Sequence, residues 1–113
     1  MVRSEEAVRD LKRYLERNYH RPLRIGTVCV ERYHSEQYVC RRFRELLGVS
    51  PKQYLMQLRL RHTAQKLLST NDAIYQIAFS CGFTDINNFC KQFRGEFGCT
   101  PGQYREQNKK DGQ

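Results

Sequence analysis

The chain of 113 residues has no tryptophan, only three prolines and no hydrophobic run long enough to cross a bilayer. Its five cysteines are odd in number and include no C-x-x-C pair, so their spacing indicates neither a disulfide framework nor a zinc knuckle. The first residues, MVRSEEAVRDLKRYL, lack the apolar core of a signal peptide. Alternation typical of a strand never lasts more than a few residues. We therefore expect an all-α, cytoplasmic protein with no metal, cofactor or membrane contact.

Acidic residues are also scarce, because 12 Asp and Glu stand against 20 Lys and Arg, which gives a formal charge of +8. A charge of this size on a small domain favours a polyanionic partner, and nucleic acid is the first candidate. Residues 1–61 hold 14 basic and 7 acidic residues, whereas residues 62–113 hold 6 and 5. The alternative is a basic helical interaction module that binds an acidic protein partner. Preference for one duplex over a scrambled duplex would separate the two.

The sequence contains an internal repeat. The stretch CRRFRELLGVSPKQY at residues 40–54 returns without a gap as CKQFRGEFGCTPGQY at residues 90–104. Upstream, the apolar spacing of residues 25–29 returns at residues 74–78. Two copies are too few for a helical solenoid, which needs at least three. The chain is therefore predicted to hold two related helical units.

Apolar residues at spacings of three and four predict helices along nearly the whole chain. The first helix is expected to run from about Ser4, its N-cap, to Tyr19. In each repeat a short helix, a tight turn and a longer helix follow, and Gly48 or Gly98 ends the longer helix as a left-handed residue. The predicted organisation is a first helix-turn-helix subdomain at 1–50, a linker helix at 51–69, a second helix-turn-helix subdomain at 70–108 and a frayed tail at 109–113.

Two capping boxes are predicted. SPKQ at residues 50–53 and TPGQ at residues 100–103 each place Ser or Thr at the N-cap, Pro at the first helical position and Gln at the third. The first box opens the long linker helix, which is expected to continue to about Leu68. The second opens a short final helix that is expected to end near Glu106.

A short helix joined by a tight turn to a second helix is a helix-turn-helix, whose second helix enters the major groove of DNA. A helical wheel places Val39, Phe43, Phe89 and Phe93 on the core faces of the two second helices. Their opposite faces carry Gln37, Arg41 and Arg44 in the first copy, with Cys40 beside them, and Asn87, Lys91 and Arg94 in the second, with Asn88 flanking. Gln and Asn pair with adenine, and Arg and Lys pair with guanine. A polar face on one helix would indicate only solvation, but its presence in both copies favours DNA reading.

Residues 74–105, IYQIAFSCGFTDINNFCKQFRGEFGCTPGQYR, resemble the signature region of the AraC/XylS family of bacterial transcription regulators. The first half, SEQYVCRRFRELLGVSPKQYL followed by RLRHTAQKLL, is also similar to that family. The resemblance covers nearly the whole chain. It implies a homeodomain-like, tandem fold of about seven helices, in which two helix-turn-helix subdomains joined by a long linker helix bind two successive major-groove segments.

The resemblance also implies roles for single residues. Base readers fall on Gln37, Cys40 and Arg41 in the first copy and on Ile86, Asn87, Asn88 and Lys91 in the second, although the wheel places Ile86 near the core flank and we leave it out. Phosphate contacts are expected from Ser35, Arg42, Arg44, Lys52, Thr84 and Arg94. The chain departs from the family at Tyr33, where Gly is usual and which is a poor left-handed residue. Cys40 is a weak hydrogen-bonding group, suited to an apolar contact with a thymine methyl.

The copies carry different reading residues, so one monomer is expected to read an asymmetric double-stranded site. A linker helix of about 17 residues spans roughly 25 Å, which can place two recognition helices about 34 Å apart, one turn of DNA. Family members usually attach an N-terminal effector-sensing and dimerising domain, so the chain is expected to be a stand-alone regulator or a fragment of a longer one. RNA polymerase is a further expected partner. The three histidines have no catalytic neighbours at a suggestive spacing, so no enzyme is expected.

Overall fold

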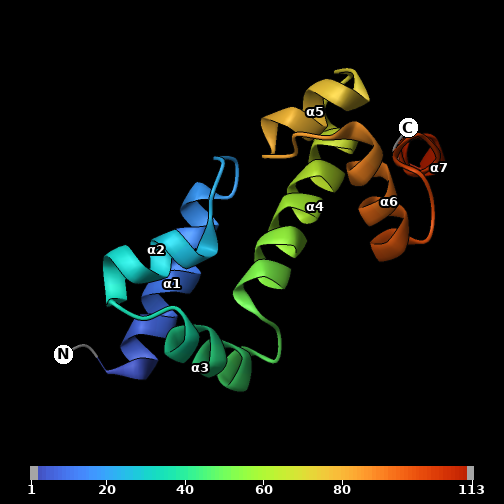
Figure 1. The fold of residues 1–113 in the computed structure, drawn as a ribbon. Coiled ribbons are helices and arrows are strands. Elements are labelled where there is room, and N and C mark those ends of the chain that lie inside the picture. Colours follow the sequence, from blue (N-terminus) through green and yellow to red (C-terminus); the bar gives the residue numbers. More distant parts are fainter. Residues whose placement is uncertain (1–2, 112–113) are drawn as a thin grey trace. The chain divides into compact units, whose positions relative to one another are not determined.

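Seven α-helices and no strand make up the part of the chain that the computed structural model describes, which is residues 3–111 for the backbone and 3–108 for the side chains. The all-α prediction is confirmed. The helices, shown in chain order in Figure 1, are α1 (Ser4–Asn18), α2 (Ile25–Tyr33), α3 (Gln37–Leu47), α4 (Pro51–Ser69), α5 (Ile74–Ser80), α6 (Ile86–Phe97) and α7 (Pro101–Asp111). They form two compact units that divide within α4, because one unit ends at Leu58 and the other begins at Arg59.

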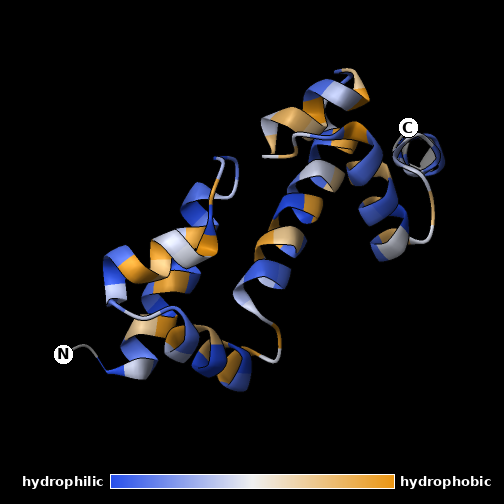
Figure 2. Cartoon of the chain, viewed as in Figure 1, coloured by the Kyte–Doolittle hydropathy of each residue, from blue (hydrophilic) through white to orange (hydrophobic). Residues whose placement is uncertain are grey.

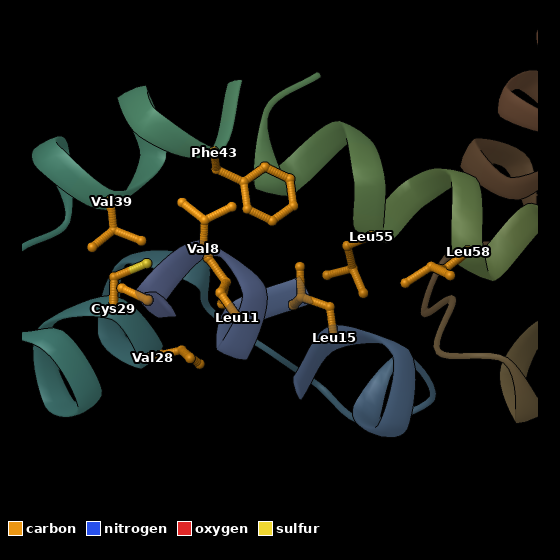
Figure 3. Close-up of a cluster of buried hydrophobic side chains, with 10 residues drawn as sticks. Val8, Leu11, Leu15, Val28, Cys29, Val39, Phe43, Leu55 and Leu58 are labelled. Carbon is orange, nitrogen blue, oxygen red and sulfur yellow. The ribbon is translucent and has the colours of Figure 1, made fainter. Parts of the chain in front are cut away.

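The core of the first unit combines side chains of α1, α2, α3 and the beginning of α4. Figure 3 shows Val8, Leu11 and Leu15 of α1 gathered with Phe43 of α3 and Leu55 of α4. All five side chains are buried. Burying one large apolar side chain contributes about 1.5–3 kcal/mol. This burial fixes one face of α3 against the core and leaves the opposite face outside.

Aromatic side chains dominate the core of the second unit. Phe89 and Phe93 of α6 are fully buried, as the helical wheel predicts. The ring of Phe89 lies 4.8 Å from that of Phe83, and the ring of Phe93 lies 5.4 Å from that of Tyr104 in α7. Edge-to-face pairs of this kind add about 0.5–1.5 kcal/mol beyond the burial of area. The orientation of α6 is therefore set by its phenylalanine stripe.

Both predicted capping boxes are present. The Ser50 hydroxyl accepts a hydrogen bond from the Gln53 amide nitrogen at 3.2 Å, and Oε1 of Gln53 accepts one from the Ser50 amide nitrogen at 3.0 Å. The same two bonds, at 3.1 and 3.0 Å, join Thr100 and Gln103. Each box satisfies backbone donors that the first turn of a helix leaves without partners. The starts of α4 and α7 are thus set by local sequence.

The ends of the other helices agree with the sequence at the glycine stops and differ elsewhere. The described glycines with positive φ are Gly48, Gly82 and Gly98. Ser4 is the first residue of α1 and not its N-cap, because its side chain makes no cap bond and its hydroxyl accepts from α3 instead. α7 continues to Asp111, past the predicted end near Glu106, since no proline or glycine interrupts residues 103–111. Of the predicted frayed tail, residues 112–113 lie outside the described range.

Two hydrogen-bonded side chains, Thr63 and Arg105, support α4, which carries both apolar and polar residues along its length (Figure 2). Thr63 is fully buried, and its hydroxyl donates to the Leu60 carbonyl at 2.7 Å. The guanidinium of Arg105 donates to the carbonyls of Leu67 at 2.9 Å and Thr70 at 3.2 Å. These carbonyls belong to the last turn of α4, where acceptors lack partners within the helix. Arg105 therefore attaches α7 to the end of α4.

Candidate nucleic-acid interface

The outer face of α3 begins at Gln37, the first residue of the helix. Gln37 and Arg41 are exposed and lie one helical turn apart on the side away from the core. The Ser35 hydroxyl accepts a 3.2 Å hydrogen bond from the amide nitrogen of Tyr38. The Ser35 hydroxyl therefore stabilises the first turn of α3, which starts two residues later. Both predicted readers lie near the N-terminal end, which is the end that recognition helices present to bases.

The side chain of Arg41 contacts two other residues of α3. Its Nε lies 3.6 Å from Oε1 of Glu45, and its guanidinium carbon lies 5.4 Å from the centre of the Tyr38 ring. The side chain is 67% exposed. Exposed ion pairs are worth less than about 1 kcal/mol each. The guanidinium can therefore leave Glu45 when a better partner is offered.

Cys40 lies at the margin of this face and is half-buried. Burial raises the pKa of its thiol, which packs against the core cluster that includes the fully buried Cys29 of α2. The pKa of Cys29 is raised to about 12, first by burial and then by Cys40. Both sulfurs are therefore protonated at neutral pH. A protonated thiol is a weak hydrogen-bonding group, in keeping with the apolar contact expected of Cys40.

Arg42, a predicted phosphate contact, is tied into the first unit. Its Nη1 donates to Oε2 of Glu45 at 2.9 Å, and its Nε donates to the Ser4 hydroxyl at 3.3 Å. Its Nη2 lies 4.0 Å from the Glu5 carboxylate, and the side chain is only 24% exposed. No feature of the sequence distinguishes Arg42 from its neighbours in this respect. Arg42 joins α3 to the start of α1.

The remaining predicted phosphate contacts are more accessible. Four of them are exposed: Arg44, Lys52, Thr84 and Arg94. Within residues 3–108 none of the three cations in this set forms an ion pair. The fifth, Ser35, is half-buried at the start of α3. These exposed cations can neutralise phosphates of a polyanion, which releases the counterions condensed on it.

The turn between α2 and α3 takes its left-handed residue at His34, with φ 62°, and not at Tyr33. Tyr33 is the last residue of α2, and its hydroxyl donates to Oδ2 of Asp10 at 2.6 Å. Arg32 donates to the same oxygen at 2.9 Å and lies 4.6 Å above the Tyr14 ring. These contacts lower the pKa of Asp10, with the Tyr33 hydrogen bond as the largest cause. Tyr33, which stands where the family usually has Gly, therefore stays helical, and His34 is the left-handed residue of the turn.

The second unit presents α6 in the same way. Oδ1 of Asp85 accepts from the amide nitrogens of Asn87 at 2.9 Å and Asn88 at 3.3 Å, which caps the helix. The predicted readers Asn87, Asn88 and Lys91 are exposed. Ile86 is half-buried, in keeping with its place on the wheel at the core flank. An exposed amide thus precedes an exposed cation by one helical turn on α6, as on α3.

Sequence reasoning missed three residues that shape these faces: Tyr38, Glu45 and Asp85. Glu45 carried a readable signal, because an acidic residue one turn after Arg41 predicts an ion pair. Asp85 also carried one, since Asp directly before an apolar helical pattern is typical of an N-cap. For Tyr38 the signal is weak, because a tyrosine near an arginine on a helix often only packs. Two of the three were therefore within reach of the sequence.

Among the described residues, no group of three or more His, Cys, Asp or Glu side chains is placed to hold a metal ion. No helix in that part of the chain combines the length and the apolar character needed to cross a membrane.

Two helix-turn-helix units, each with the outer face of its second helix exposed, define a tandem helix-turn-helix domain. A family model described as "Helix-turn-helix domain" matches residues 31–107. The chain belongs to the AraC-type helix-turn-helix family. It spans about a third of the length of the curated relatives that it matches.

Individual relatives agree with this assignment. The HTH-type transcriptional activator RhaR of Klebsiella pneumoniae is 36% identical over 89 residues, which cover 79% of this chain and 32% of RhaR. The C-terminal domain of AraT, a response regulator from Geobacillus stearothermophilus, matches with a TM-score of 0.85 at 28% identity and covers 89% of this chain and 84% of its own. The DNA-binding domain of AdpA, solved in complex with a target DNA, matches with a TM-score of 0.82 at 25% identity over 88% and 89% of the two chains. The predicted fold is confirmed by these structures.

Proposed function

We propose that this chain binds double-stranded DNA sequence-specifically in the major groove and acts in bacterial transcription regulation. The main observation behind the proposal is that the same arrangement of exposed side chains occurs on both second helices, α3 and α6. Gln37 and Arg41 on α3, and Asn87 and Lys91 on α6, each combine an exposed amide with an exposed cation one turn later. Amides can pair with adenine and cations with guanine. The family assignment and the AdpA domain's complex with a target DNA support the same function.

The proposed base readers are Gln37, Cys40, Arg41, Asn87, Asn88 and Lys91. Among the proposed phosphate contacts, Arg44, Lys52, Thr84 and Arg94 come first because they are exposed, whereas Ser35 and Arg42 already serve the fold. The reading residues differ between the two units, so the target is an asymmetric site of two successive major-groove segments. Two units on one chain supply the bivalence that other helix-turn-helix proteins obtain by dimerising, so one monomer should occupy one site.

Further partners belong to the same proposal. RhaR is described as an activator, and the chain spans about a third of such relatives. A longer protein with an N-terminal effector-sensing and dimerising domain, acting on RNA polymerase in the cytoplasm, is therefore our proposed context. Sedimentation of the protein with one minimal duplex tests the monomer proposal. A complex with two chains per duplex contradicts it.

Selection of bound sequences from a random DNA pool tests the proposed function. The selected duplex and a scrambled duplex of equal composition then compete for the protein at moderate salt. We expect a preference on the order of a thousandfold for the selected duplex, because direct readout discriminates at each contacted base pair. Equal binding of the two duplexes, with retention of an acidic protein ligand, would instead support a basic interaction module.

A further inference from the structure

We infer that Glu45 is a positioning residue that restrains Arg41 and Arg42 and thereby makes the first unit selective for its site, an inference that rests on the proposed function. Its carboxylate lies between the two arginines. Oε1 is 3.6 Å from Nε of Arg41, and Oε2 accepts a 2.9 Å hydrogen bond from Nη1 of Arg42. One carboxylate thus engages the proposed reader and its neighbour at once.

The arrangement is accessible from outside. The side chain of Glu45 is 50% exposed and that of Arg41 is 67% exposed, whereas Arg42 is 24% exposed and also contacts Ser4 and Glu5. Arg42 is therefore the fixed member of the group and Arg41 the mobile one. DNA that engages Nε of Arg41 must draw that atom away from Glu45, and DNA that engages its Nη atoms must share the guanidinium with the carboxylate.

Glu45 affects specific and non-specific complexes differently. A guanine offers Arg41 two acceptors in a fixed geometry, which compensates for the lost ion pair. A phosphate met in an arbitrary register offers a looser contact, and its charge is repelled by Glu45. The carboxylate therefore weakens binding to scrambled DNA more than binding to the selected site. It therefore raises selectivity at some cost in affinity.

The second unit lacks this restraint. In the repeat, Lys91 stands where the first copy has Arg41, and Gly95 stands where it has Glu45. In the described part of the chain Lys91 forms no ion pair. The recognition surface therefore carries a carboxylate next to the cation in the first unit and lacks it in the second. A substitution at residue 45 removes this carboxylate, and one at residue 95 introduces it.

Glu45→Gln removes the charge and keeps the shape of the side chain. We expect its affinity for scrambled duplex to rise about threefold to fivefold, the range set by one exposed ion pair. Affinity for the selected duplex should rise less, so the ratio of the two affinities falls. The slope of log K against log salt on scrambled duplex should steepen by about 0.9 for each arginine that gains a phosphate. A residue that only supported the fold would lower both affinities together and leave the slope unchanged.

Gly95→Glu is the reverse experiment. A side chain fits there, because a Cβ at Gly95 meets nothing within 4 Å and the residue has no positive φ. The new carboxylate follows Lys91 by one turn and should lower affinity for scrambled duplex about twofold to fivefold, with a smaller loss on the selected duplex. Gly95→Gln is the matched control, because it changes helix propensity without adding charge. It should leave the ratio of affinities unchanged.

The outcomes separate the inference from the proposed function. If the unmodified protein does not distinguish selected from scrambled duplex, both fail. If it does, and Glu45→Gln changes neither the ratio nor the salt slope, the inference alone is overturned. If Gly95→Glu and Gly95→Gln behave alike, an acidic residue at this position has no effect on selectivity, and the inference is again overturned. Opposite changes in the ratio for Glu45→Gln and Gly95→Glu establish it.

Discussion

The Tyr33 hydroxyl donates a 2.6 Å hydrogen bond to Oδ2 of Asp10 and so joins the end of α2 to α1. In the second unit the residue at the equivalent place in the repeat is Gly82, which has φ 103°. The first turn places His34 in the left-handed region and adds the Tyr33 contact, whereas the second turn uses the conformational freedom of glycine. The same architecture is reached by two different local solutions.

Tyr33→Phe should lower the free energy of unfolding of the first unit by about 0.5–1.5 kcal/mol, because the ring remains while the hydrogen bond is lost. Native-state hydrogen exchange of amides in α1 and α2 measures this change unit by unit. Tyr75→Phe is the control, since Tyr75 is exposed in the second unit. Equal protection in wild type and Tyr33→Phe would show that the hydroxyl contributes nothing.

The same contact predicts a pH dependence. The pKa of Asp10 in the folded protein is lowered, first by the Tyr33 hydrogen bond and then by Arg32, below an ordinary carboxyl pKa of about 3.9. A lowered folded-state pKa stabilises the first unit above the unfolded-state pKa, and this stabilisation is lost as pH falls through the folded-state value. Unfolding free energies measured between about pH 5 and pH 2 should therefore fall less steeply in Asp10→Asn than in wild type. Parallel curves would contradict the assignment.

Each phenylalanine at the centre of a recognition helix should stabilise its own unit. Phe43 and Phe93 are both fully buried. Replacing either by Ala should cost about 3–5 kcal/mol, because the cavity adds to the lost transfer energy. Leu46→Ala is the control, since Leu46 is 45% exposed. Urea unfolding followed by amide signals from each unit measures the loss, and a Phe43→Ala variant with unchanged stability would mean that the packing of α3 is misassigned.

Arg105→Met should destabilise the second unit by about 1–3 kcal/mol, because it leaves the Leu67 and Thr70 carbonyls without a charged donor while keeping an apolar stem. Gln107→Met, at an exposed position of the same helix, is the control. Thermal unfolding of the two variants compares them directly. Identical midpoints would show that water replaces the guanidinium without cost.

The elements were predictable from the sequence because their signals are local. Apolar spacing along each helix, the glycine stops and the two capping boxes all depend on residues within four or five positions of each other. The outer faces of α3 and α6 follow from the same periodicity, which is why Gln37, Arg41, Asn87 and Lys91 are exposed as expected. The candidate reading surface was therefore largely predictable.

The interactions that modify that surface were not predictable, because they join distant residues. Arg42 contacts Ser4 across the unit, and Tyr33 reaches Asp10. Cys40 packs against the core cluster that includes Cys29 of the preceding helix. Such contacts depend on how α1, α2 and α3 cross and on which rotamers then fit, and helical periodicity holds no information on either. For this reason the sequence does not distinguish Arg42, which is bound within the unit, from Arg44, which is exposed.

Arg41→Ala and Lys91→Ala should each relax sequence preference at a few base pairs, in two patches about one helical turn of DNA apart. If the residue reads a guanine, the loss at that base pair should be about 1–3 kcal/mol. Binding measured on a panel of singly substituted duplexes locates the affected positions. Equal weakening on every duplex, scrambled included, would indicate that the residue contacts only phosphate.

The two units should contribute unequally to salt-dependent binding. Residues 1–58 carry 12 basic and 7 acidic residues and residues 59–113 carry 8 and 5, so the net charges are +5 and +3 and long-range attraction favours the first unit. Within the first unit, Arg32 and Arg42 are already engaged by Asp10 and Glu45, whereas Arg44 and Lys52 are exposed.

Neutralising Arg44 and Lys52 together should therefore reduce the slope of log K against log salt by about 1.8, since each lost phosphate contact removes about 0.9. Arg94→Gln in the second unit should remove about 0.9, and Arg42→Gln should change stability more than slope because its guanidinium is bound within the unit. Neutralising Arg44 with Lys52 should therefore outweigh neutralising Lys91 with Arg94, because Lys91 is a proposed base reader and only Arg94 of that pair is a proposed phosphate contact. Filter binding or fluorescence anisotropy between low and moderate salt measures all of these slopes. If the pair in the second unit flattens the slope as much as or more than the pair in the first, the asymmetry of charge along the chain has no counterpart in DNA binding, and anchoring is shared by the two units.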